Sequence, residues 1–329
     1  MKKLTRILLY VWALGLLGAL PARALQLVYP ADQTSVHRSD FLIIKGSEQP
    51  PLEGMSVEIN GAKSDVIDIS GADYRAAFQD FLILQPSFDP GRNVVKVAGY
   101  RGGQVVANQT ATVYYLPGPY DLPPTDFPTF VMHRPEKEAL CAGCHNMNPT
   151  PEQLAQTTPD TNPCAACHRR MLQDKYVHGP AGAFRCAYCH QPDSQPNRYQ
   201  SPDGDAGLCN QCHQEKVDEF KKNKFVHGPV AVGLCSVCHD AHASNNPAQV
   251  VLPINDLCLS CHAKVSGAPH VVRGIRGEAH PLRGVQDPSQ PGRELSCVSC
   301  HNPHGGKTEY FFVRNINGRF SLCELCHQK

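Results

Sequence analysis

Cys141-Ala142-Gly143-Cys144-His145 is the first of eight C-x-x-C-H segments in a chain of 329 residues. The eight segments use all 16 cysteines, so the chain has no cysteine before Cys141. In chain order, the segments contain Cys141/Cys144/His145, Cys164/Cys167/His168, Cys186/Cys189/His190, Cys209/Cys212/His213, Cys235/Cys238/His239, Cys258/Cys261/His262, Cys297/Cys300/His301 and Cys323/Cys326/His327. This distribution divides the chain near residue 130 into a cysteine-free part and a cysteine-rich part.

The C-x-x-C-H spacing is typical of attachment sites for c-type haem. Two thiols about one helical turn apart add to the two vinyl groups of the haem, and the adjacent imidazole binds the iron as its proximal ligand. The 16 cysteines are therefore predicted attachment sites for eight c-type haems, numbered 1 to 8 by segment. The histidine of each segment is the predicted proximal ligand.

Zinc sites and disulfides are the two alternatives for these cysteines. Between Cys144 and Cys164 there are 19 residues, a gap that also suits paired C-x-x-C zinc ligands. Disulfides form in exported proteins. Neither alternative explains a histidine after every cysteine pair when histidine is only 16 of 329 residues. Haem is therefore favoured.

Eight histidines lie outside the segments, and seven of these are in the cysteine-rich part. Neutral imidazole binds iron well and is a natural second axial ligand. The seven candidate distal ligands are His133, His178, His227, His242, His270, His280 and His304. The eighth, His37, is predicted to be a surface residue of the cysteine-free part.

The segments form an internal repeat of four doublets. The first cysteines of a doublet are 23, 23, 23 and 26 residues apart, and Val177-His178-Gly179-Pro180 recurs as Val226-His227-Gly228-Pro229. From about residue 130 to 329 the chain resembles doubled-CxxCH multihaem cytochromes and, more distantly, tetrahaem class III cytochromes c. The resemblance implies closely spaced haems that pass electrons from iron to iron.

The resemblance also implies distal ligands for most irons. Three histidines lie eight residues before a segment, and two lie three residues after a segment histidine. By this resemblance, His133, His178 and His227 are the distal ligands of haems 1, 3 and 5. His242 and His304 are those of haems 6 and 8. His280 is the distal ligand of haem 7, with His270 as the alternative.

Haems 2 and 4 depart from this pattern, because Asn148 and Asp193 occupy the positions of His242 and His304. Met147 and Met171 lie near the segments and are either thioether ligands or, as favoured, residues that pack on porphyrin. Otherwise His270 reaches haem 4, or one iron is five-coordinate and binds a small ligand.

Residues 1–24 have the pattern of an export signal. A basic start precedes an apolar run from Ile7 to Leu20, and Pro21-Ala22-Arg23-Ala24 offers a small-x-small cleavage site. The run of 14 residues is shorter than the about 20 that span a bilayer, although an uncleaved anchor is the alternative. Cleavage removes four basic residues and no acid, which changes the formal charge from +1 to −3. No transmembrane segment is expected after cleavage.

Residues 25–117 are predicted to form a small all-β sandwich, because short alternating apolar segments are separated by turn signals. They resemble bacterial immunoglobulin-like adaptor domains at Tyr29-Pro30-Ala31-Asp32, Ile59-Asn60-Gly61 and Gly91-Arg92-Asn93-Val94-Val95-Lys96-Val97. The resemblance implies a spacer or docking module. Residues 118–130 are rich in proline and are predicted to be an extended linker.

Residues 131–329 are predicted to form an octahaem cytochrome c domain. About 25 residues per haem are too few for a core of side chains alone. We therefore expect loops and short helices packed on the haems, and an unfolded apoprotein.

The expected function is electron transport by an exported octahaem cytochrome, not enzymatic catalysis. Its expected partners are other redox proteins, namely periplasmic or outer-membrane cytochromes, and a porin or surface assembly contacted by the β-domain. The location is the periplasm, the outer membrane or the cell exterior. The alternative is a multihaem reductase of nitrite, hydroxylamine or a sulfur oxyanion at a five-coordinate haem. A net charge of +1 argues against nucleic-acid binding.

Overall fold

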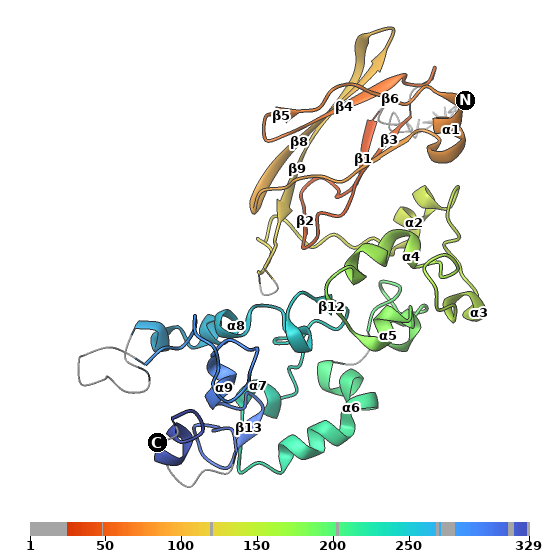
Figure 1. The fold of residues 1–329 in the computed structure, drawn as a ribbon. Coiled ribbons are helices and arrows are strands. Elements are labelled where there is room, and N and C mark those ends of the chain that lie inside the picture. Colours follow the sequence, from red (N-terminus) through yellow and green to blue (C-terminus); the bar gives the residue numbers. More distant parts are fainter. Residues whose placement is uncertain are drawn as a thin grey trace, which may run out of the picture. The chain divides into compact units, whose positions relative to one another are not determined.

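The computed structural model describes residues 25–47, 49–118, 121–201, 204–267, 270, 280–314 and 319–327. These residues belong to two compact units. The first unit extends to Pro117 and includes Asp121–Phe130, and the second contains Gly118–Tyr120 and Val131–Lys329. The first is built from β-sheets and the second from loops and short helices, as the sequence predicted (Figure 1).

The first unit contains two sheets. Three antiparallel strands form the smaller sheet, in the order β1 (Leu25–Tyr29), β3 (Leu42–Gly46) and β7 (Phe81–Leu84). The larger sheet has the order β2 (Thr34–Val36), β9 (Gln104–Tyr115), β8 (Gly91–Arg101), β4 (Gly54–Ile59) and β5 (Ala62–Lys63), with β6 (Ile67–Asp68) also paired to β4. Strand β2 runs parallel to β9, and the other pairs of this sheet are antiparallel.

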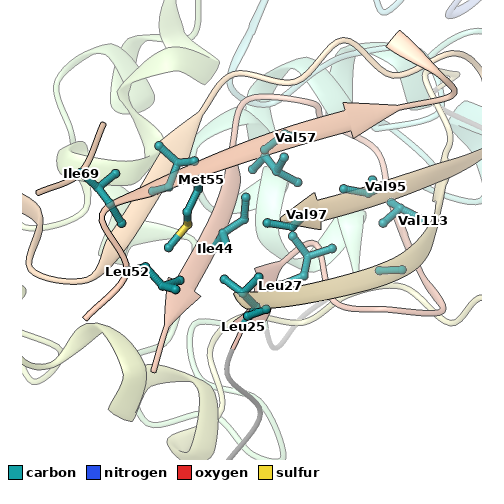
Figure 2. Packing of buried hydrophobic residues seen from close by; sticks show 14 of the residues in the cluster. Leu25, Leu27, Ile44, Leu52, Met55, Val57, Ile69, Val95, Val97 and Val113 are labelled. Atoms are coloured by element: carbon teal, nitrogen blue, oxygen red, sulfur yellow. The ribbon is translucent and has the colours of Figure 1, made fainter. Parts of the chain in front are cut away.

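Apolar side chains from both sheets meet in one buried cluster (Figure 2). Strand β8 shows why: Val95 and Val97 are at most 2% exposed, whereas Lys96 between them pairs with Glu58 at 2.7 Å. This alternation places one face of the strand in the core and the other in solvent. Ile44 from the smaller sheet enters the same cluster.

The first unit also contains one short helix. Helix α1 (Ala72–Phe78) precedes β7, which begins at Phe81. Ala76 and Ala77 favour a helix, and the helix ends before the apolar residues that pair with β3.

The proline-rich residues after Asp121 are not a free linker. The backbone N–H of Ser35 donates to the carbonyl of Pro128 at 3.0 Å, and that of Phe130 donates to Ser35 at 2.9 Å. Phe127 is 2% exposed, and the Arg92 guanidinium lies 4.7 Å from its ring centre. Residues 121–130 therefore pack on the edge of the first unit, which differs from the predicted linker 118–130.

Short helices and two small ribbons build the second unit. The helices are α2 (Pro135–Cys141), α3 (Pro151–Leu154), α4 (Ala165–His168), α5 (Gly179–Gly182), α6 (Asp205–Lys221), α7 (Gly228–Ala231), α8 (Ile254–Cys261), α9 (Cys297–Cys300) and α10 (Arg319–Cys323). Strand β10 (Tyr176–Val177) pairs with β12 (Ala243–Ser244), and β11 (Phe225–Val226) pairs with β13 (Gly305–Gly306). Both pairs are antiparallel and join segments distant in sequence.

Local signals explain where the helices begin. At α3, the Thr150 side chain accepts from Gln153 N–H in a capping box, and Pro151 occupies the first turn. Helix α6 is the longest described helix and begins at Asp205, after Gly204. This helix has 17 residues and buries no side chain. Among the described residues, no helix is long and apolar enough to cross a membrane.

Candidate haem-binding site

Each C-x-x-C-H segment adopts a single helical turn. In the first segment, the backbone N–H of His145 donates to the carbonyl of Cys141 at 2.9 Å, and in the last, that of His327 donates to Cys323 at 2.9 Å. A bond between residues four apart closes one α-turn, so the first cysteine and the histidine lie on the same side. This local conformation suits attachment of a planar group through the thiols with the imidazole facing it.

The thiols do not form the arrangements that the two alternatives require. No disulfide joins any of the 16 cysteines, all of which lie among the described residues. Within the described residues, no cluster of three or more histidine, cysteine or acidic side chains is placed to hold a metal ion. A zinc site of the C-x-x-C type needs four such ligands around one point.

Where one doublet follows another, the first cysteine of the last segment lies in contact with the first cysteine of the next segment. Cys164 and Cys186 are hydrogen-bonded, which raises the pKa of Cys164 and lowers that of Cys186 to about 7. The same bond joins Cys258 and Cys297. Cys209 is close to Cys235, and burial together with this neighbour raises its pKa to about 11.

Within a doublet, the second cysteines are neighbours. Burial raises the pKa of Cys189, Cys238 and Cys300, and in each case the thiol of the following segment adds to the shift. The partners are Cys212, Cys261 and Cys326. The second to the eighth segments therefore lie next to one another in chain order.

Seven of the eight segment histidines lie beside a histidine from outside the segments. The ring centres are 5.8 to 6.2 Å apart in every pair. The pairs are His168 with His133, His190 with His242, His213 with His178, His239 with His304, His262 with His227, His301 with His270, and His327 with His280.

These separations fit one metal ion between two imidazoles. A metal–nitrogen bond of about 2 Å on each side, as imidazole makes with zinc, places the two nitrogens about 4 Å apart. Each ring centre lies about 1 Å behind its nitrogen, so the centres are expected about 6 Å apart. The histidine pairs of this chain therefore match the spacing that haem iron requires.

Hydrogen bonds orient the imidazoles for ligation through Nε2. Nδ1 of His190, His239 and His301 lies 2.9, 2.8 and 2.6 Å from the carbonyl oxygen nine residues later in each case. Nδ1 of His178 similarly faces the carbonyl of Ala241 at 3.0 Å. An Nδ1–H that donates to a carbonyl leaves Nε2 free for a metal.

Burial favours the neutral form of several of these imidazoles. It lowers the pKa of four histidines, because the charged form loses hydration. The four are His190, His227, His270 and His304. Neutral imidazole is the form that binds a metal.

A buried carboxylate supports one pair. Glu138, whose side chain is 7% exposed, lies with Oε1 3.0 Å from Nδ1 of His133, and its Oε2 accepts from Arg198 at 2.9 Å. The tyrosine ring of Tyr199 packs edge-on against His133 at 4.8 Å. Sequence reasoning missed Glu138 and Arg198, since they are 60 residues apart and neither belongs to a motif.

The pairing differs from the expected one. His133, His178 and His227 were expected at haems 1, 3 and 5 but lie beside the histidines of segments 2, 4 and 6. His242 and His304 were expected at haems 6 and 8 but lie at segments 3 and 5.

The last doublet differs in the same way. His280, expected at haem 7, lies beside His327 of segment 8, and its rival His270 lies beside His301 of segment 7. Segments 2 and 4 thus have histidine partners and need neither Met147 nor Met171. Among the described residues of the second unit, only His145 of the segment histidines has no histidine partner.

The two ribbons explain most of this difference. The N–H of His178 donates to the carbonyl of His242 at 2.8 Å, next to the pairing of Val177 with Ala243. The ribbon brings the loop after segment 5 back to the second doublet, so His242 lies at segment 3. The offsets along the chain do not contain this long-range contact.

Apolar side chains in and near the segments are exposed in the polypeptide. Tyr188 lies inside segment 3 and is 63% exposed, Leu234 directly precedes segment 5 and is 48% exposed, and Phe320 precedes segment 8 and is 85% exposed. Single exposed apolar side chains are ordinary on folded proteins, so the feature of interest here is the position of these three beside the cysteines. They are placed where a macrocycle attached to the adjacent cysteines would contact them.

Comparisons with known proteins agree with this chemistry. A family model described as the doubled CXXCH motif matches residues 178–218, 227–267 and 290–329, which contain six of the eight segments. No curated protein matches the chain.

Similarity to solved structures is weak. The chain is 12% identical to an endo-β-1,4-mannanase from Thermotoga petrophila over 29% of this chain and 20% of that one, with a TM-score of 0.22. It is 12% identical to the fibronectin(III)-like modules of CbhA from Clostridium thermocellum over 28% of this chain and 94% of that one, with a TM-score of 0.20. The chain thus spans only a fifth of the mannanase. The three doubled CXXCH motifs, by contrast, indicate a multihaem c-type cytochrome with covalently bound haem and a role in electron transfer.

Proposed function

We propose that the chain is an exported octahaem cytochrome that carries electrons between other redox proteins. The observation that carries this proposal is the set of seven histidine pairs, each combining one segment histidine with one histidine from elsewhere at 5.8 to 6.2 Å. Two imidazoles on one haem iron would fill both of its axial positions. Such a site would carry electrons and leave no free position for a substrate.

The cysteines would hold the haems and the histidine pairs would hold the irons. Bound c-type haem supplies a one-electron carrier at each position. The polypeptide contributes the axial ligands, fixes their orientation through the Nδ1 hydrogen bonds, and covers the macrocycles with apolar side chains.

The thiol contacts support transfer in chain order. First cysteines meet between doublets, as in Cys164 with Cys186, and second cysteines meet within doublets, as in Cys189 with Cys212. Attachment at neighbouring thiols would bring consecutive macrocycles close together. The proposed path therefore runs from segment 2 to segment 8 with no segment omitted.

Export is part of the proposal. A mature formal charge of −3, made more negative by haem propionates, favours basic surfaces on partner proteins and salt-dependent association. We assign to the first unit, as an immunoglobulin-like sandwich, the docking of the carrier to a porin, a surface assembly or a cytochrome in the periplasm or outer membrane.

The test is expression of the full chain in a bacterial host that attaches c-type haem. The expected product is red, lacks residues 1–24, and has the mass of the mature chain plus eight haems, with a matching pyridine haemochrome. Stopped-flow mixing of the reduced protein with a basic cytochrome should show rates that fall as salt rises. A colourless product, or fewer than eight haems per chain, would contradict the proposal.

The reductase alternative is favoured by one observation: among the described residues of the second unit, His145 lies beside no other histidine. Turnover of nitrite or hydroxylamine by the reduced protein would support it. Fast electron exchange with a cytochrome and no turnover would support the carrier.

A further inference from the structure

Histidines that follow a segment serve the preceding doublet. His242 is three residues after His239, and its ring lies 6.0 Å from that of His190. His304 is three residues after His301, and its ring lies 6.2 Å from that of His239. In both cases the histidine crosses back to the first segment of the doublet before its own.

The loop after segment 3 has the same architecture as the loops after segments 5 and 7. In all three, Nδ1 of the segment histidine lies within 2.9 Å of the carbonyl oxygen nine residues later. Backbone bridges close the loops between Gln191 and Gln200, His239 and Val250, and His301 and Phe312. By this rule, the residue three after His190 should serve His145.

That residue is Asp193, which is exposed. A carboxylate is a harder ligand than imidazole and suits magnesium, calcium or manganese better than haem iron. The seven histidines outside the segments in the second unit each lie beside another segment histidine. The remaining one, His37, belongs to the β-unit.

We propose that the haem held by Cys141, Cys144 and His145 takes its second axial ligand from solution and binds small diatomic π-acceptor molecules of the carbon monoxide and nitric oxide type. The inference rests on the proposed octahaem function and adds a ligand-binding site to it. Histidine at position 193 would close this site, as His242 and His304 close the sites at segments 3 and 5.

The test compares the full holo-protein with its Asp193→His variant. For the wild type, electron paramagnetic resonance of the oxidised protein should show one high-spin haem and seven low-spin haems. The reduced protein should bind one carbon monoxide per chain. Asp193→His should remove both signals. His242→Asp should add a second high-spin haem and a second carbon monoxide, since it recreates the proposed arrangement at segment 3.

Control variants and distinct outcomes keep the inference separate from its basis. Asp65→His adds a histidine at an exposed aspartate of the β-unit and should leave one carbon monoxide per chain. A wild type with eight low-spin haems and no carbon monoxide binding overturns the inference, while the octahaem proposal stands. In that case, a high-spin signal that arises in His37→Ala would identify His37 as the second ligand of the haem at His145. Unchanged binding in Asp193→His also overturns it. A chain without haem would instead overturn the proposed function itself.

Discussion

The backbone N–H of His178 donates a 2.8 Å hydrogen bond to the carbonyl oxygen of His242. This bond extends the β10–β12 ribbon and holds the candidate ligands of two neighbouring haems back to back. The β11–β13 ribbon repeats the arrangement, with His227 donating to His304 at 3.4 Å. Each ribbon therefore holds both candidate distal ligands of one doublet, segments 3 and 4 at the first ribbon and segments 5 and 6 at the second.

The histidine pairing can be tested by removing one ligand and one haem at a time. His178→Ala should give one additional high-spin haem, because His213 loses its partner at 6.1 Å. In a chain with Cys209→Ser and Cys212→Ser, which cannot attach haem 4, the same substitution should add no high-spin signal. In a chain with Cys186→Ser and Cys189→Ser it should still add one. Electron paramagnetic resonance distinguishes these results, and the reverse pattern would restore the pairing of His178 with haem 3.

Gly305 is the ribbon residue that tolerates a side chain least. Its φ is +142°, and a Cβ would lie 2.6 Å from the carbonyl oxygen of Phe225. Gly305→Ala should therefore separate β11 from β13, cost on the order of 2 kcal/mol of unfolding free energy, and raise the high-spin fraction at haems 5 and 6. Denaturant unfolding and electron paramagnetic resonance measure the two effects.

Gly228 is the matched control, because a Cβ there meets no atom within 4 Å. Gly228→Ala should change the unfolding free energy by less than about 1 kcal/mol and leave the spin state unaltered. Equal effects of the two substitutions would show that the ribbon does not hold the ligands.

Sequence reasoning identified the chemistry of the second unit but not its long-range pairing. The C-x-x-C-H segments are local, and their helical turns follow from five consecutive residues. The partner of His190 is His242, whose position depends on a two-residue ribbon, Tyr176–Val177 with Ala243–Ser244. Such short strands have no periodicity to recognise, so the offset of eight residues assigned His178 to segment 3, whereas its ring lies beside that of His213 in segment 4.

The first unit was predictable for a different reason. Val95 and Val97 alternate with polar neighbours, and this period of two predicts a strand with one buried face. The proline-rich residues 121–130 were misread because composition suggested a linker, whereas Phe127 and Phe130 bury apolar rings against the sheet. A contact of this kind depends on tertiary packing, which composition does not report.

Glu138 should influence both stability and redox potential. Glu138→Gln removes the charge that balances Arg198, whose side chain is only 19% exposed, and should cost about 3 kcal/mol. It should also raise the potential of the haem that His133 serves, since an uncharged neighbour makes the imidazole a weaker donor. Denaturant unfolding and a potentiometric titration would measure these changes.

The Lys216–Glu219 pair provides the comparison, because its side chains are 67% and 65% exposed. Glu219→Gln should change stability by at most about 0.5 kcal/mol. Its charge acts on His304, so any change in potential should be confined to the haem that His304 serves and be smaller than the change caused by Glu138→Gln. If Glu138→Gln behaved like Glu219→Gln, the buried carboxylate would have no role in supporting His133.

Alkaline pH should destabilise the first unit through Tyr29. Burial, with a smaller contribution from Asp40, raises the pKa of Tyr29 to about 12. Between pH 10 and 12 the unfolded chain loses the phenol proton while the folded chain retains it, so stability is fully present below pH 10 and declines as pH rises. At about 1.4 kcal/mol per pKa unit, the rise from 10 to about 12 makes the loss about 3 kcal/mol.

Tyr29→Phe should flatten this decline, because phenylalanine keeps the edge-on contact with Phe130 at 5.1 Å and has no proton to lose. Tyr100 gives a control of opposite sign, since the hydroxyl of Ser56 lowers the pKa of Tyr100 in the folded state. Its own contribution grows with pH, so Tyr100→Phe should make the alkaline decline steeper. Denaturant unfolding from pH 9 to 12, followed by far-ultraviolet circular dichroism, compares the three proteins. Parallel curves for wild type and Tyr29→Phe would show that Tyr29 ionises equally in the folded and unfolded chain.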